Sequence, residues 1–147
     1  MAMTANRKCI EQFLSAFYSG NLQGALDCCD DEIDFLAHVP IDILPHMGHR
    51  RGKAEVLGMW QAIHGRYSHM RYDLPFVAEE SDSAAVIIRV YFRKSDNDRI
   101  VHMDIADFYR FRSGRILQIR QFTDSFDLAQ QVLERDIASI LIEKRSK

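Results

Sequence analysis

Beyond Tyr67, apolar and polar residues alternate with a period of two over most of the chain, and this alternation constrains the fold more than any other feature. Side chains of a β-strand alternate between its two faces, so the pattern predicts strands with one buried face. Turn-forming residues at 81–83, 96–97 and 113–114 divide the stretch into four strands of an antiparallel meander. The predicted inward sets are Met70, Tyr72, Leu74, Phe76 and Ala78; Ala84, Val86, Ile88, Val90 and Phe92; Val101, Met103, Ile105, Asp107, Tyr109 and Phe111; and Leu117, Ile119, Gln121 and Thr123.

The first half of the chain has the 3.6-residue period of amphipathic helices instead. An aromatic-rich stripe predicts a helix over residues 6–20, and Asn21 can cap a short helix over residues 22–29. Residues 33–39 alternate like a strand. The stretch 39–53 holds two of the three prolines and indicates an ordered loop.

Two more helices are predicted, one over residues 53–65 and a long one over residues 125–144. This order of elements predicts one α+β domain over residues 1–147, in which a curved antiparallel sheet wraps around the N-terminal helices. Such an arrangement leaves a cavity between the sheet and the helices. We expect the apolar stripe of the long C-terminal helix to cover the sheet or a partner subunit.

The composition excludes several classes of protein. With a net charge of -2 and 27% charged residues, the chain lacks the basic excess of a nucleic-acid-binding protein. It has no apolar run of a membrane span and no apolar segment of signal-peptide type at its start, so we expect a cytoplasmic protein that binds no membrane. The three cysteines, Cys9, Cys28 and Cys29, are expected to be free thiols that pack in the core.

Asp107 is the one charged residue in the predicted inward sets. A buried carboxylate is costly unless it is paired or protonated, so its presence indicates either a structural connection or chemistry. A two-residue turn at 96–97 places Val86 opposite Asp107. A three-residue loop at 113–115, with Gly114 in the left-handed conformation, places Gln121 opposite Asp107 on the other side.

The same register places four polar residues on the outer face of the sheet, with Arg89 opposite Asp104 and Tyr91 opposite His102. These residues could form a catalytic cluster. The preferred interpretation is a solvated face with cross-strand ion pairs, or a polar dimer interface.

Two loop histidines, His46 and His49, together with His38 at the end of the preceding strand, are candidate metal ligands, with Asp42 as the only nearby acid. No helix holds them on one face, so we predict no metal site and expect a loop that flanks the pocket entrance. The basic stretch 49–53 could bind an anion at a helix N-terminus, but a solvated loop is the simpler interpretation. Asp124 is a helix cap or a residue of the pocket rim.

Four motifs occur in a distinctive order along nearly the whole chain. They are an aromatic helix ending in S-G-N-L-Q-G-A-L, then D-D-E-I-D-F, a P-x-x-G-x-x-x-G-K loop, and D-F-Y-R-F-R-S-G-R-I. In this order the chain resembles the NTF2-like superfamily, in its SnoaL-like and ketosteroid-isomerase-like branch. The resemblance implies a cone-shaped (cystatin-like) α+β fold with a deep apolar pocket, a homodimer through the outer sheet face, and no metal or cofactor.

The steroid-isomerase pattern is met only in part. Asp107 matches the aspartic acid of that family's oxyanion hole. Ala37 occupies the position of the general base, and Phe13 the position of the tyrosine on the first helix. Steroid-type isomerisation by the family mechanism is therefore not expected. SnoaL-like polyketide cyclases use an acid/base aspartate in a comparable pocket, which leaves a role for Asp107 in proton transfer.

Two hypotheses follow. In the first, the protein is a cofactor-independent isomerase, cyclase or hydrolase for a small hydrophobic carbonyl compound, with Asp107 as acid or hydrogen-bond donor and Gln121 orienting it. In the second, it is a non-catalytic ligand-binding or dimeric scaffolding module. The predicted pocket residues are Phe13, Phe17, Tyr18, Phe35, Ala37, His38, Trp60, Tyr72, Met103, Tyr109, Ile119 and Thr123.

Overall fold

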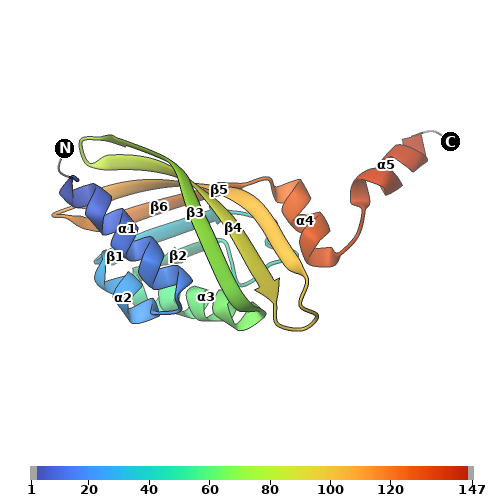
Figure 1. The fold of residues 1–147 in the computed structure, drawn as a ribbon, viewed down its shortest axis with the longest axis horizontal. Coiled ribbons are helices and arrows are strands. Elements are labelled where there is room, and N and C mark those ends of the chain that lie inside the picture. Colours follow the sequence, from blue (N-terminus) through green and yellow to red (C-terminus); the bar gives the residue numbers. More distant parts are fainter. Residues whose placement is uncertain (1–2, 146–147) are drawn as a thin grey trace.

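A six-stranded sheet dominates the computed structural model, which describes residues 3–145 (Figure 1). The strands, in chain order, are β1 (Cys29–His38), β2 (His49–Arg51), β3 (Tyr67–Glu80), β4 (Ser83–Lys94), β5 (Ile100–Arg112) and β6 (Arg115–Thr123). Their order across the curved sheet is β2-β1-β6-β5-β4-β3. The prediction of an antiparallel sheet is right for the meander from β3 to β6 and wrong for β1, which runs parallel to β6. No hairpin joins these two strands, so no turn signal indicated their direction.

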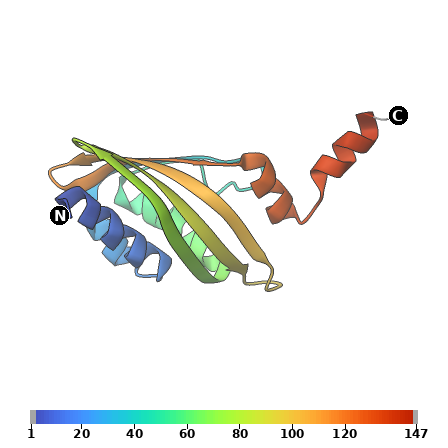
Figure 2. The same cartoon turned by 45° about the horizontal axis from the view of Figure 1, so that its top comes forward.

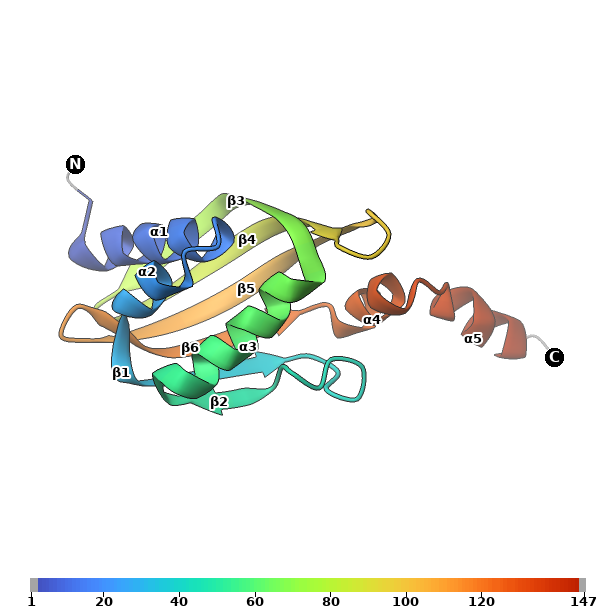
Figure 3. The ribbon, with the colours of Figure 1, turned by 90° about the horizontal axis from the view of Figure 1, so that it is seen from below.

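Three helices lie against the concave face of the sheet (Figures 2 and 3). They are α1 (Ala5–Tyr18), α2 (Leu22–Asp27) and α3 (Gly52–Arg66). The side chain of Asn21 accepts a hydrogen bond from the Gly24 backbone N–H, which confirms the predicted cap of α2. The apolar stripes of α1 and α3 are buried against the sheet, so the α+β prediction is confirmed.

The predicted register of the β4–β5 hairpin is confirmed, with Val86 opposite Asp107. The predicted two-residue turn is wrong. The Lys94 N–H donates to the Arg99 carbonyl at 2.8 Å, so residues 95–98 form a four-residue loop. The loop is longer than predicted because residues 95 and 98 belong to it and do not pair with each other. The pairing of the other residues of the hairpin is unchanged.

The β5–β6 hairpin places Gln121 opposite Asp107, as predicted, by a different route. Ser113 and Gly114 form a two-residue turn with φ of +51° and +77°, so the expected three-residue loop is wrong. A β-bulge next to Phe111 places one extra, unpaired residue in β6. This residue restores the predicted pairing of Gln121 with Asp107. Because of this bulge, Ile116 is fully buried where Leu117 was predicted to point inward.

Strand β3 departs from the predicted alternation in its second half. Its pairing with β4 shifts between Asp73 and Phe76, next to Pro75, which has no backbone N–H to donate. As a result Phe76 is 49% exposed and Ala78 is also exposed, although both were predicted to point inward, and Val77 packs against the core instead.

The C-terminal segment forms two helices, α4 (Ser125–Leu133) and α5 (Ile137–Arg145), where one long helix was predicted. Glu134 takes the left-handed conformation and ends α4, and Lys94 donates hydrogen bonds to the Gln131 carbonyl and the Glu134 carboxylate. Asp124 caps α4 through the backbone N–H of Asp127. Helix α5 projects away from the sheet, and none of residues 137–145 is buried (Figure 1). The expectation of a segment that covers the sheet is therefore wrong for α5, and its alternative, a contact with a partner subunit, stays a prediction.

Helix α4 is fixed against β5 by the side-chain amide of Gln131. This amide accepts a hydrogen bond from the His102 N–H and donates one to the His102 carbonyl, both at 2.8 Å. At His102, strand β5 has passed its last residue pair with β6. The Gln131 amide therefore makes the backbone hydrogen bonds that a neighbouring strand would make. The contact holds α4 at one end of the space enclosed by sheet and helices.

The outer face of the sheet carries the four predicted polar residues. Arg89 Nε donates to Asp104 Oδ1 at 3.0 Å. The Tyr91 and His102 rings stack, with 4.5 Å between their centroids. All four lie on the side away from the helices, as the register predicted. Within residues 3–145, no helix has both the length and the apolar character needed to cross a bilayer.

Candidate functional site

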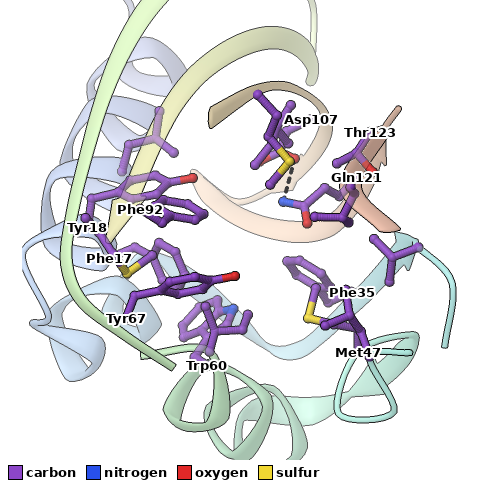
Figure 4. Close-up of a pocket in the computed structure, with 18 of the residues that line it drawn as sticks. Phe17, Tyr18, Phe35, Met47, Trp60, Tyr67, Phe92, Asp107, Gln121 and Thr123 are labelled. Atoms are coloured by element: carbon purple, nitrogen blue, oxygen red, sulfur yellow. Dashed lines mark hydrogen bonds between the residues drawn. The ribbon is translucent and has the colours of Figure 1, made fainter. Parts of the chain in front are cut away.

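A cavity of about 80 Å³ lies between the concave face of the sheet and helices α1 and α3 (Figure 4). The loop from Val39 to Met47 and Leu128 of α4 line one end. Seven aromatic side chains form much of the wall: Phe13, Phe17, Tyr18, Phe35, Trp60, Tyr67 and Phe92. The polar lining consists of His46, Asp107, Gln121 and Thr123. An engineered apolar cavity of roughly 150 Å³ holds benzene, so this space suits a ligand with few non-hydrogen atoms.

Asp107 is 3% exposed and holds two hydrogen bonds, one at each carboxylate oxygen. Gln121 Nε2 donates to Oδ1 at 3.0 Å, and the Tyr109 hydroxyl donates to Oδ2 at 2.9 Å. Both donors are neutral. Within residues 3–145, no lysine, arginine or histidine nitrogen forms an ion pair with this carboxylate.

Burial raises the pKa of Asp107 from 3.8 to about 6, and the hydrogen bonds from Gln121 and Tyr109 oppose part of that rise. The carboxyl group is therefore mostly ionised at neutral pH and mostly protonated below pH 6. A carboxyl group with a pKa in this range can accept a proton and return it at physiological pH.

Hydroxyl groups supply further hydrogen-bond donors at the cavity wall. Those of Tyr18 and Tyr67 point into the cavity (Figure 4). Burial, followed by the charge of Asp107, raises the pKa of Tyr18 well above its usual value, so this hydroxyl keeps its proton. Thr123 Oγ1 is buried and has no hydrogen-bond partner within residues 3–145, which leaves it available to a ligand.

The structure brings most of the predicted site residues together. Asp107 and Gln121 are adjacent, and the cavity lining includes the predicted residues Phe13, Phe17, Tyr18, Phe35, Trp60, Met103 and Thr123.

Five predicted pocket residues do not line the cavity: Ala37, His38, Tyr72, Tyr109 and Ile119. Ala37 and Ile119 are buried in the core, and the Tyr72 ring stacks on Tyr18 at 4.8 Å from its centroid. Tyr109 is 2% exposed and lies behind the cavity wall, where its hydroxyl donates to Asp107. His38 lies on the outer face, where its ring stacks on Phe122 at 4.3 Å, because strand parity turns it away from the cavity.

Sequence reasoning missed several lining residues. Tyr67 begins β3 immediately after α3, at the point where the period changes, so neither pattern assigns its side chain to a face. Phe92 was predicted to point inward but was not assigned to the pocket. Leu44 and Met47 lie in the irregular loop, where no periodicity indicates which side chains turn inward. Leu44 and Met47 are 5% and 8% exposed, and this burial identifies them as residues that point inward.

The loop histidines point to different places. His46 lines the cavity, and burial followed by the charges of Arg66 and Arg50 lowers its pKa. His49 Nε2 lies 2.7 Å from the Asp34 carboxylate, which also pairs with Arg51 and Arg120. Two acidic side chains of β1 thus balance part of the charge of the basic stretch, because Asp34 pairs with Arg51 and Asp31 lies 3.3 Å from the Lys53 ammonium.

Comparison with known proteins identifies the family. The family model of the SnoaL-like domain matches residues 10–119. The chain belongs to the SnoaL-like domain family. No curated protein matches it.

Solved structures share the fold over nearly the whole chain. A Rhodopseudomonas palustris protein provisionally described as an isomerase is 29% identical, with a TM-score of 0.79 over 92% of this chain and 100% of its own. An NTF2-like protein of unknown function from Burkholderia pseudomallei is 17% identical, with a TM-score of 0.81 over 88% of this chain and 98% of its own. A protein of Jannaschia sp. provisionally described as a SnoaL-like polyketide cyclase is 10% identical, with a TM-score of 0.76 over 90% and 96%. The recognition of an NTF2-like, SnoaL-like fold is therefore confirmed.

Proposed function

We propose that this SnoaL-like protein is a cofactor-independent enzyme that moves a proton on a small hydrophobic carbonyl compound. The observation that supports the proposal is the buried carboxylate of Asp107 at the wall of an aromatic cavity, held by two neutral donors. With a pKa of about 6, the group is a base in the resting protein at neutral pH. The sequence favours Asp107 as an acid or hydrogen-bond donor, and the proposal here makes it a base that becomes an acid after the first step.

The proposed reaction has two proton transfers. Asp107 takes a proton from the carbon next to the substrate carbonyl, and the electron pair of the C–H bond moves to the carbonyl oxygen to form an enolate. The hydroxyl groups of Tyr18 and Tyr67 can donate to that oxygen, which compensates for Phe13 at the family's tyrosine position. Asp107 then returns its proton to a carbon of the enolate, and the carboxylate is restored.

Deuterium exchange tests this chemistry without knowledge of the natural substrate. Cyclopentanone in D₂O exchanges its α-protons, and ¹H NMR follows the loss of signal. We expect the protein to accelerate the exchange and Asp107→Asn to lower the acceleration about 100-fold or more. Asp104→Asn, the same change on the outer face of the same strand, should leave the rate unchanged. Equal rates with the wild type and Asp107→Asn would contradict the proposal.

The non-catalytic alternative rests on the two internal hydrogen bonds of Asp107. Gln121 and Tyr109 satisfy one lone pair on each oxygen and could serve only to stabilise a buried acid. This alternative is supported if small ketones shift the NMR signal of the Trp60 indole but the protein does not accelerate their deuterium exchange.

We further propose that the chain forms a homodimer through the outer sheet face. Residues paired across β3, β4, β5 and β6 form an apolar row there: Phe76, Ile87, Ala106 and Phe122. Phe76 and Phe122 are 49% and 42% exposed, and such a row favours association. Phe122→Glu should convert the dimer to a monomer in sedimentation velocity, while Phe126→Glu, on α4, should not. A wild-type monomer at 100 µM would refute the proposal.

A further inference from the structure

The electrostatic character of the cavity points to a ligand class different from the neutral carbonyl compound. Asp107 is the one acidic residue among the lining residues, and the lining contains no lysine or arginine within the described part of the chain. His46 is the remaining titratable imidazole at the wall, and burial together with Arg66 and Arg50 lowers its pKa, so it is neutral at pH 7. Tyr18 and Tyr67 are neutral as well, because burial raises the pKa of each. The empty cavity therefore carries one unbalanced negative charge at neutral pH.

Two other acidic side chains of the sheet have cationic partners. Asp30 pairs with Arg112 at 2.8 Å, and Asp104 pairs with Arg89 at 3.0 Å. Asp107 is more deeply buried than either, yet its partners are a phenol and a carboxamide. A buried charge without an opposite charge is costly, and a bound cation would offset part of that cost.

The aromatic wall favours a cation with an apolar surface. Ring faces attract cations within about 6 Å through the ring quadrupole, and the attraction is strongest in sites that exclude water. Trp60 lies 5.4 Å from Phe17 and 5.6 Å from Phe13 between ring centroids, and all three rings line the cavity. The ring plane of Phe17 is inclined at 66° to that of Trp60, and the ring plane of Phe13 at 55°, so the three rings meet the cavity at different angles.

We propose that the cavity binds a small alkylammonium ion, with its charge on Asp107 and its methyl groups against the aromatic wall. The cavity volume of about 80 Å³ limits the ion to few non-hydrogen atoms. This inference concerns binding and does not rest on the proposed reaction. For an enzyme, such an ion competes with the neutral substrate, because it occupies the carboxylate that serves as the base.

Two probes of equal size separate charge from shape. Tetramethylammonium and tert-butanol each have five non-hydrogen atoms, and only the first is charged. We expect titrations followed by ¹H–¹⁵N NMR to show tetramethylammonium binding at pH 7 with shifts at Gln121 and the Trp60 indole. tert-Butanol should bind at least about tenfold more weakly, the ratio that corresponds to one close electrostatic contact. The affinity for tetramethylammonium should fall about tenfold between pH 7 and pH 5, as protonation removes the charge of Asp107.

Two variants make the test specific. Asp107→Asn should abolish the preference for the cation, and its NMR spectrum reports whether the fold is intact. Asp104→Asn, which removes an outer-face carboxylate from the same strand, should retain both the preference and its pH dependence. The proposal is overturned if tetramethylammonium at 100 mM does not bind, if both probes bind equally, or if Asp107→Asn retains the preference. Loss of ketone exchange with intact cation binding would reject the proposed reaction alone.

Discussion

Replacing Asp107 with asparagine should stabilise the protein at neutral pH, although the residue lies in the core of the candidate site. The pKa of this carboxyl rises from 3.8 to about 6 on folding because burial penalises its charged form. A raised pKa means that the folded state binds the proton more tightly than the unfolded state. The group therefore adds stability at low pH, and this contribution is lost as the pH rises through 6.

The magnitude follows from the same values. At roughly 1.4 kcal/mol per pH unit, a rise from 3.8 to about 6 corresponds to about 3 kcal/mol at pH 7. Asparagine is uncharged and has nearly the same shape. Its carbonyl can accept the bond from Gln121, and its amide can donate to the Tyr109 hydroxyl. We thus expect Asp107→Asn to raise the free energy of unfolding at pH 7 by up to about 3 kcal/mol.

Urea denaturation of the wild type and Asp107→Asn at pH 4, 5, 6 and 7 measures the difference. The two proteins should have similar free energies of unfolding at pH 4. The advantage of the variant over the wild type should grow between pH 4 and pH 6 and stay constant above pH 7. Asp104→Asn provides the opposite sign, since its ion pair with Arg89 lowers the pKa of Asp104. A variant less stable than the wild type at pH 7, or a difference independent of pH, would refute the reasoning.

Two further predictions concern the contacts around the site. Tyr109→Phe removes one hydrogen bond to the carboxylate, worth roughly 1.5–3 kcal/mol, and should raise the pKa of Asp107 by about one to two units in a ¹³C NMR titration; an unchanged pKa would exclude Tyr109 as a positioning residue. Lys94→Met leaves the carbonyls of Gln131 and Val132 without their donor and should cost about 1–3 kcal/mol, with faster hydrogen exchange over α4. Unchanged exchange over α4 would show that Lys94 does not hold this helix.

The sequence predicts those features of the fold that depend on local alternation between two turns. The pairing of Val86 with Asp107 and of Asp107 with Gln121 follows because both strands must turn the same face to the core. The prediction fails where the backbone departs from regular geometry. Pro75 interrupts β3, and Glu134 divides the C-terminal segment by taking a conformation that is uncommon for a residue with a side chain.

The site is predicted less completely than the fold. Asp107 and Gln121 are detectable because a polar residue in an apolar strand face breaks a pattern. Tyr67 and Met47 break none, since one lies at a helix–strand junction and the other in an irregular loop. Side chains at such junctions and loops line part of the cavity, and periodicity does not indicate which of them turn inward.

The β-bulge beside Phe111 determines the charge of the cavity through the spacing of the backbone. If Leu117 paired with Arg110 in a regular ladder, without the bulge, Arg120 would lie opposite Asp107 in place of Gln121 and could form an internal salt bridge with it. Insertion of one residue into β6 between the bulge and Gln121 would have the same effect, whereas deletion of Leu117 would remove the bulge and leave Gln121 opposite Asp107. In this fold, a one-residue insertion in one hairpin is therefore a route from a buried carboxylate with neutral partners to a structural ion pair.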